Sequence, residues 1–183
     1  MARSPELLVL LDSDGTPIGR REKHEVHGFD TPLHLAFSCY LLDDDGKVLV
    51  TRRALEKQAW PGVWTNSFCG HPAPGEPMEA AIRRRAQQEL GAEIDEVRER
   101  LPDFRYRAVD ASGIVENEIC PVYTAVVSGS VNPEPNEVVE WEWVDPEVLL
   151  RSVTGTPFAF SPWLREQLPS LIERSAFTGA GVV

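Results

Sequence analysis

Residues 77–90 carry a helical pattern that any fold of this chain must accommodate. Apolar side chains recur there at helical spacing, and strong helix formers fill the positions between them. Gly91 follows directly, as is typical of the end of a helix. We therefore expect one amphipathic helix, whose apolar positions are Ala81, Ile82, Ala86 and Leu90.

Strand patterns flank this helix on both sides. Residues 6–20 contain an apolar run, an Asp-Gly turn and a second short strand pattern, which together predict a β-hairpin. Residues 33–54 repeat this arrangement around Asp45 and Gly46. We expect the two hairpins to begin one sheet. Further strands are expected at residues 104–109, 115–127 and 138–144.

The C-terminal part of the chain is expected to be helical. A short helix should begin near Asp145 and Pro146, and a second should run from residue 161 to about 175 with Pro169 interrupting it. Residues 177–183 are expected to be frayed.

A single domain is expected over residues 1–183, because no repeat, low-complexity segment or long linker divides the sequence. Residues 1–22 contain its N-terminal hairpin and are a candidate lid. The fold class indicated is mixed α/β (α+β), with a mostly antiparallel sheet and helices packed on its faces. The sequence leaves the oligomeric state open and is compatible with a monomer.

Composition excludes several classes of function. The 29 acidic and 18 basic residues give a net charge of -11, which would repel a nucleic-acid backbone. No segment has the roughly 18 consecutive apolar residues of a membrane span, and no secretory signal is recognisable, so we expect a cytoplasmic protein. An anionic substrate would require positive charge to be concentrated locally.

The three cysteines are an odd number in a chain of ordinary domain size, which indicates reduced thiols. Cys39 and Cys120 lie within apolar strand patterns and fit small buried side chains. Cys69 has polar neighbours and does not fit that interpretation. Cys69 and His71 are two residues apart and would share one side of an extended backbone.

A second pair of polar residues occurs in the strand pattern at residues 115–127. Glu116 and Glu118 project from the same face of a strand, so their like charges need a cation, a shared proton or exposure to water. From the strand alone, solvent-exposed carboxylates on an edge strand are the simpler interpretation. All four histidines lie before residue 72, and an isolated histidine is more often structural than a metal ligand.

The helix and the loop before it resemble the Nudix box, G-x5-E-x7-R-E-U-x-E-E-x-G-U, where U is aliphatic. Gly70, Glu76 and Arg84 match the first part of this motif. In the Nudix family this loop and helix hold a divalent metal on a diphosphate. The resemblance therefore implies a diphosphate substrate.

Two acidic positions of the Nudix box are changed in this chain. Arg85 and Gln88 stand where the motif has glutamates, and Glu89 remains as an acid. The loss of two carboxylates weakens a metal cluster that would activate water. Ordinary diphosphate hydrolysis is therefore expected to be impaired.

Six blocks in order resemble the type I isopentenyl diphosphate isomerases, a Nudix-fold family. They are LHLAFS, TRRA, WPGVWTNSFCGHP, PDFRYRA, GIVENEICPV and AFSPW, and the matching part runs from about Lys23 to Trp163. The resemblance implies interconversion of isopentenyl and dimethylallyl diphosphate by adding a proton to one carbon and removing a proton from another. It places the chain in isoprenoid biosynthesis.

The resemblance also implies roles for particular residues. Cys69 and Glu118 would transfer the protons from opposite sides of the alkene, with Tyr106 assisting Glu118, and which of the pair donates is left open. A site for Mn²⁺ or Zn²⁺ would be formed by His27, His34, His71, Glu116 and Glu118. His24 has no counterpart and is expected on the surface.

A second metal and the substrate contacts follow from the same resemblance. Glu89 and the backbone carbonyl of Cys69 would hold Mg²⁺ on the diphosphate. Trp163 would lie near the hydrocarbon end of the substrate and stabilise positive charge. The diphosphate would be bound by Lys23, Arg53, Lys57 and Arg85.

Two other functions remain open from the sequence. One is a Nudix hydrolase of a nucleoside or other diphosphate, which the two missing acids disfavour. The other is a catalytically silent metal-binding or interaction module, which would require a missing chemical residue. None of Cys69, Tyr106, Glu116 and Glu118 is missing.

Overall fold

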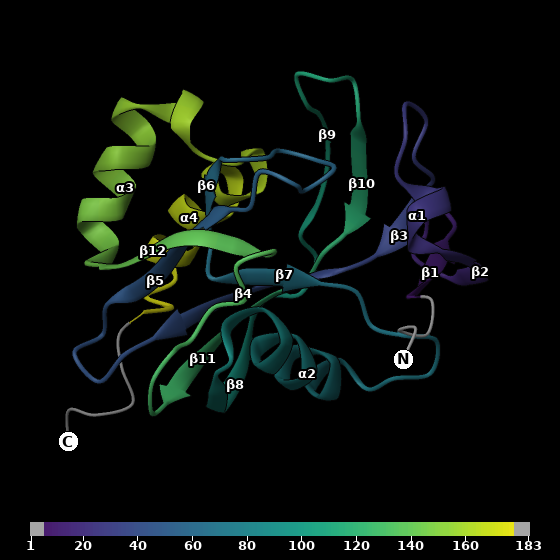
Figure 1. The fold of residues 1–183 in the computed structure, drawn as a ribbon. Coiled ribbons are helices and arrows are strands. Elements are labelled where there is room, and N and C mark those ends of the chain that lie inside the picture. The colour runs from purple at the N-terminus through teal and green to yellow at the C-terminus, as the bar shows by residue number, and fades with distance from the viewer. Residues whose placement is uncertain (1–5, 178–183) are drawn as a thin grey trace.

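Two β-sheets with helices around them make up the computed structural model, which describes residues 6–177 (Figure 1). The strand pairs are mostly antiparallel, with two parallel pairs. The expected α+β class with a mixed sheet is confirmed, although two sheets replace the single sheet that the hairpins predicted. None of the helices in residues 6–177 has the length and apolar character needed to cross a membrane.

The first sheet carries the N-terminal hairpin and has five strands. The hairpin expected at residues 6–20 is confirmed, and it pairs through β1 with the short strand β3. β3 in turn pairs in parallel with β10. In order across the sheet the strands are β2 (Pro17–Glu22), β1 (Leu7–Leu11), β3 (His34–Leu35), β10 (Val115–Ile119) and β9 (Arg105–Val109).

The second sheet contains most of the buried apolar strand residues. Its strands in order are β12 (Val138–Val144), β5 (Val48–Arg53), β4 (Phe37–Leu42), β11 (Val122–Ser128) and β8 (Glu93–Leu101). Two short strands are attached to it. They are β6 (Trp64–Thr65), which pairs with β5, and β7 (Phe68–Gly70), which pairs with β4.

Helices cover both faces of the second sheet. Side chains alternate across a strand, so Phe37, Cys39 and Leu41 of β4 face α2 (Met78–Leu90), while Tyr40 and Leu42 face the opposite side. The expected helix at residues 77–90 is thus confirmed, and Gly91 ends it with a positive φ of 55°. The opposite face is covered by α3 (Pro146–Gly155) and α4 (Pro162–Glu173), and η1 (Pro157–Ala159) joins these two helices.

Within residues 6–177 the chain crosses between the sheets three times, and two of these crossings lie side by side. β3 leads into β4 through Ala36, and β10 leads into β11 through Cys120 and Pro121. The two crossings are hydrogen-bonded to each other: the Ala36 amide donates to the Ile119 carbonyl at 3.0 Å, and the Ser38 amide donates to the Pro121 carbonyl at 3.1 Å. The prediction of one strand over residues 115–127 is therefore wrong.

Three further expectations need correction. β8 was not expected, because it is an edge strand rich in charged residues with few buried side chains. α4 continues through Pro169, since Leu164, Leu168 and Leu171 are fully buried and hold the helix in place despite the missing N–H. Phe177 is buried against Tyr40 and not frayed, while the rest of the expected tail lies outside the described residues.

Candidate active site

A cavity lies where residues from the two sheets and the neighbouring loops meet. All the residues expected at the site line this cavity except His34, which is fully buried behind it and contacts Glu118. The structure therefore brings the expected residues together. The residues lining it are Lys23, His27, Arg53, Lys57, Gln58, Ala59, Cys69, Gly70, His71, Arg85, Glu89, Tyr106, Glu116, Glu118 and Trp163.

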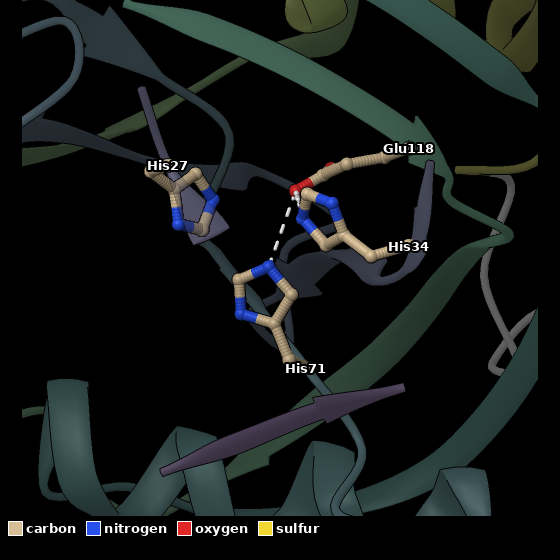
Figure 2. Close-up of side chains that lie close together, drawn as sticks. All are labelled: His27, His34, His71 and Glu118. Atoms are coloured by element: carbon tan, nitrogen blue, oxygen red, sulfur yellow. Dashed lines mark hydrogen bonds and ion pairs between the residues drawn. The ribbon is translucent and has the colours of Figure 1, made fainter. Parts of the chain in front are cut away.

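Three histidines gather at one end of the cavity. The ring centroids of His27, His34 and His71 are 5.1 to 5.7 Å apart, and the rings of His34 and His71 contact the Glu118 carboxylate (Figure 2). Glu118 Oε1 is 3.3 Å from His34 Nε2 and 3.2 Å from His71 Nε2. His24 is exposed, as expected, and its ring is 3.3 Å from Glu22.

Backbone carbonyls fix the tautomers of two of these rings. The Nδ1 atom of His34 is 3.0 Å from the Pro32 carbonyl, and the Nδ1 atom of His27 is 3.3 Å from the Lys23 carbonyl. A carbonyl only accepts, so each Nδ1 carries the proton. In the neutral rings, each Nε2 lone pair is therefore directed toward the cluster, which is the arrangement typical of metal-binding histidines.

The cluster has the properties of a divalent cation site. Ligand atoms of His27, His34, His71 and Glu118 lie within 4.8 Å of one another. Buried polar atoms without a hydrogen bond include His34 Nε2 and Glu116 Oε2, although Glu116 is 3.0 Å from His27 Nε2. Orphaned buried atoms are costly, and a bound cation would satisfy them. Imidazoles with carboxylates suit a divalent transition metal.

Strand register places Glu118 between two other expected residues. On β10 it lies opposite His34 of β3 on one side and opposite Tyr106 of β9 on the other. Burial raises the pKa of Glu118, but His34 and His71 outweigh burial and hold the pKa well below the usual range. Burial lowers the pKa of His71 to about 3.

Cys69 reaches the cavity from β7, on the other sheet. Its thiol donates to Asn66 Oδ1 at 3.3 Å and lies 3.4 Å from the Ser38 hydroxyl. Burial raises the pKa of Cys69 to about 12, so the free thiol is protonated at neutral pH. Cys39 and Cys120 are buried, in agreement with the sequence interpretation, and all three cysteines are free.

Aromatic rings form the apolar wall of the cavity. The Trp163 ring lies 5.7 Å from Tyr106 and 5.5 Å from Trp60, and Trp163 is only 3% exposed. Burial and then the Glu118 carboxylate raise the pKa of Tyr106 well above its usual value, so the phenol keeps its proton. This wall offers π faces to the cavity.

The cations expected to bind diphosphate are all paired with protein groups. Lys23 contacts Glu6 at 3.1 Å, Lys57 pairs with Glu137, and Arg85 pairs with Glu89. A diphosphate must therefore compete with carboxylates for these cations, or reach them together with a further cation. Neither Glu6 nor Glu137 stood out in the sequence, because no motif marks them.

Arg53 is held more firmly than the lysines. Its guanidinium donates to the carbonyls of Ala59 and Trp60 and lies 5.5 Å from the Trp163 ring. Arg53 thus fixes the loop beside the cavity as well as contributing positive charge.

The Nudix-box residues Gly70, Glu76 and Arg84 have no proposed role in proton transfer, but they contact residues that line the cavity. Glu76 and Arg84 form a two-pronged ion pair at 2.8 Å, and Arg84 also donates to the His71 carbonyl at 3.1 Å. Gly70 has no space for a side chain, because a Cβ there would lie 2.7 Å from Arg85 and 2.8 Å from Phe37. These contacts hold His71 and Arg85 at the cavity.

Comparison with known proteins gives the family. The NUDIX domain model matches residues 32–169. An isopentenyl-diphosphate Delta-isomerase of Leifsonia xyli subsp. xyli is 60% identical over 178 residues, covering 96% of each chain. A second, from Clavibacter michiganensis subsp. michiganensis, is 60% identical and covers 98% of this chain and 93% of the relative. The chain belongs to the Nudix family and, within it, to the isopentenyl-diphosphate Delta-isomerases.

Solved structures show how the fold of this Nudix isomerase relates to other proteins. The DR0079 protein of Deinococcus radiodurans has a TM-score of 0.69 at 22% identity and covers 90% of this chain and 98% of that one. A MutT protein from Methanosarcina mazei Go1 has a TM-score of 0.61 at 16% identity, covering 79% and 96%. These similarities support the Nudix fold alone.

Proposed function

We propose that the chain moves the double bond of isopentenyl diphosphate to give dimethylallyl diphosphate, as a step of isoprenoid biosynthesis. The observation that carries the residue roles is that Cys69 of one sheet and Glu118 of the other line the same cavity. Adding a proton to the terminal carbon of the alkene leaves a tertiary cation, and loss of a proton from the carbon on its other side forms the new double bond. Two proton-transferring groups are therefore needed.

Cys69 and Glu118 are the groups proposed for the two proton transfers. By microscopic reversibility, the residue that donates in one direction accepts in the other. Tyr106 lies opposite Glu118 in the strand register and is proposed to orient its carboxyl group. The Trp163 face can stabilise the cation by about 1 to 2 kcal/mol in a dry site, or roughly tenfold in rate.

Two metal sites are proposed from the donor atoms present. His27, His34, His71, Glu116 and Glu118 would hold Mn²⁺ or Zn²⁺, and their orphaned buried atoms support this. Glu89 and the Cys69 carbonyl would hold Mg²⁺ on the diphosphate. A bound cation supplies positive charge that polarises the carboxyl group it contacts.

The remaining proposals concern substrate, partners and location. Lys23, Arg53, Lys57 and Arg85 line the cavity and are proposed to bind the diphosphate. A net charge of -11 disfavours nucleic acid as a partner. We place the protein in the cytoplasm.

Incubation with isopentenyl diphosphate and Mg²⁺ in D₂O, followed by NMR, tests the activity. Dimethylallyl diphosphate carrying deuterium in the methyl group formed from the alkene carbon is expected. Release of phosphate would instead indicate a Nudix hydrolase, and unchanged substrate a silent module. Either of these results would contradict the proposal.

A further inference from the structure

Asn66 lies beside the cavity, between β6 and β7, and its side chain is fully buried. The amide nitrogen donates to the backbone carbonyls of Cys39 at 3.0 Å and Phe68 at 2.8 Å. A side-chain amide has two N–H donors, and both are used. The orientation of the amide is therefore fixed, with Oδ1 facing the other way.

The fixed oxygen of Asn66 accepts hydrogen bonds from groups proposed to act on the substrate. The Cys69 thiol donates to it at 3.3 Å and the Trp163 indole N–H at 2.9 Å. The hydroxyl of Thr65 also donates to this oxygen at 2.9 Å. One atom thus fixes both the thiol and the aromatic face.

Ser38 approaches the same thiol from a buried polar chain. Tyr40 donates to Gln167 at 2.8 Å, and Gln167 donates to the Ser38 hydroxyl at 3.0 Å. With its oxygen accepting from Gln167, the Ser38 hydroxyl has one proton to donate, and the sulfurs of Cys69 and Cys120 both lie 3.4 Å from it. The Asn66 oxygen only accepts, so it is the contact that sets the direction of the Cys69 S–H bond.

We propose that Asn66 is a positioning residue for the isomerisation, holding the Cys69 thiol and the Trp163 indole in a fixed relation across the cavity. This inference depends on the proposed function, in which the thiol transfers a proton and the indole faces the cation. Errors of about 1 Å in such a relation can cost about a hundredfold in rate. Diphosphate binding should be unaffected, because Asn66 does not line the cavity.

The first experiment compares Asn66→Ala with Thr51→Val by steady-state kinetics and circular dichroism. The Thr51 hydroxyl is buried and donates to the backbone carbonyl of Asn66 at 2.9 Å, so its loss loosens the same segment without touching the thiol or the indole. We expect kcat to fall at least tenfold in Asn66→Ala, with KM within threefold. Thr51→Val should keep kcat within threefold.

A folded Asn66→Ala protein that keeps kcat within threefold of the unsubstituted protein would overturn the inference. An equal loss of kcat in Thr51→Val would also overturn it, because general loosening would then explain the effect. If the unsubstituted protein does not isomerise the substrate at all, it is the proposed function that fails.

A second measurement does not depend on folding of the Asn66 variant. The indole N–H signal of Trp163 is assigned by NMR from its absence in Trp163→Phe. We expect slow hydrogen exchange of this proton in the unsubstituted protein, and a shift of its signal in Cys69→Ala, where the shared oxygen loses one donor. Exchange at the rate of an exposed indole would show that Asn66 does not hold Trp163.

Discussion

Glu118 lies directly opposite Tyr106 in the antiparallel pair of β10 and β9. His34 takes the corresponding position on the other side of Glu118, on β3. The carboxyl group therefore has a phenol on one neighbouring strand and an imidazole on the other. Backbone pairing rather than a flexible loop determines this row of three residues.

Tyr106→Phe tests one end of the row. The variant keeps the ring that stacks on Phe104 at 5.9 Å and loses only the hydroxyl. We expect kcat to fall about tenfold or more while the protein stays folded, because the hydroxyl is proposed to orient Glu118. Turnover measured beside a thermal melt checks this, and an unchanged kcat would remove Tyr106 from the mechanism.

Cys69→Ala and Glu118→Gln should each abolish turnover with the fold intact. General acid or base catalysis by one residue typically contributes about 10² to 10⁴ in rate, and here both proton transfers are required. Cys39→Ala is the matched control, since this thiol is fully buried in the core away from the cavity. Near-native kcat in either active-site variant would show that the role assignment is wrong.

Metal binding should stabilise the protein. Mn²⁺ or Zn²⁺ at a hundred times its Kd adds about 2.7 kcal/mol, which raises the melting temperature by several degrees. His27→Ala should remove most of this increase, whereas the exposed His24→Ala should keep it. Thermal melts with and without a chelator make the comparison, and equal behaviour of the two variants would argue against the site.

Glu76→Gln should change how stability depends on pH. Hydrogen bonds from Arg84 lower the pKa of Glu76 below its ordinary value of 4.5. A depressed carboxyl pKa contributes stability above the ordinary pKa and loses it as the pH falls through the lower folded value. The unsubstituted protein should therefore be more stable than Glu76→Gln by about 1 kcal/mol at pH 7, and the difference should shrink below pH 4.5.

The control for Glu76→Gln in urea unfolding is Glu79→Gln, because Glu79 also pairs with an arginine but is more exposed. Glu79 contacts Arg83 at 2.8 Å with more than half of its side chain exposed, so Glu79→Gln should cost less than about 0.5 kcal/mol. A pH-independent difference between Glu76→Gln and the unsubstituted protein would contradict the assigned pKa shift.

Gly70→Ala should destabilise the protein by about 1 to 3 kcal/mol through overpacking. The added methyl group would lie 2.7 Å from Arg85, a residue that lines the cavity. Gly19→Ala is the control, because no atom lies within 4 Å of a Cβ built there. Equal midpoints for the two variants in urea would show that the segment adjusts freely.

Local patterns predicted most of the fold. The helix after Glu76 and the two hairpins follow from periodicity and turn residues. The division into two sheets does not, because the crossing at Ala36 interrupts an apolar run without a turn residue and the crossing at Cys120 is marked by Pro121 alone. β8 lacks the apolar alternation that marks a strand, since its position at the sheet edge leaves its charged side chains in solvent.

The candidate site was predicted mainly through the family resemblance. Without the resemblance, the strand pattern favoured solvent-exposed side chains for Glu116 and Glu118. Both are buried in the structure. The partners of the cations, Glu6 and Glu137, come from distant parts of the sequence and meet the cavity only in the fold. Asn66 lay within the matching block beside Cys69, but its contacts with Trp163 depend on α4.

The two neighbouring crossings between the sheets link the strands that position Glu118 and Cys69. The Ala36 amide donates to the carbonyl of Ile119, the residue after Glu118. The amide of Ser38, which is the strand partner of Cys69, donates to the Pro121 carbonyl. Through these bonds the parallel pair of β3 and β10 in the first sheet continues into the parallel pair of β4 and β11 in the second. Glu118 lies on β10 and Cys69 is paired with β4, so both side chains are anchored to one continuous run of paired main chain.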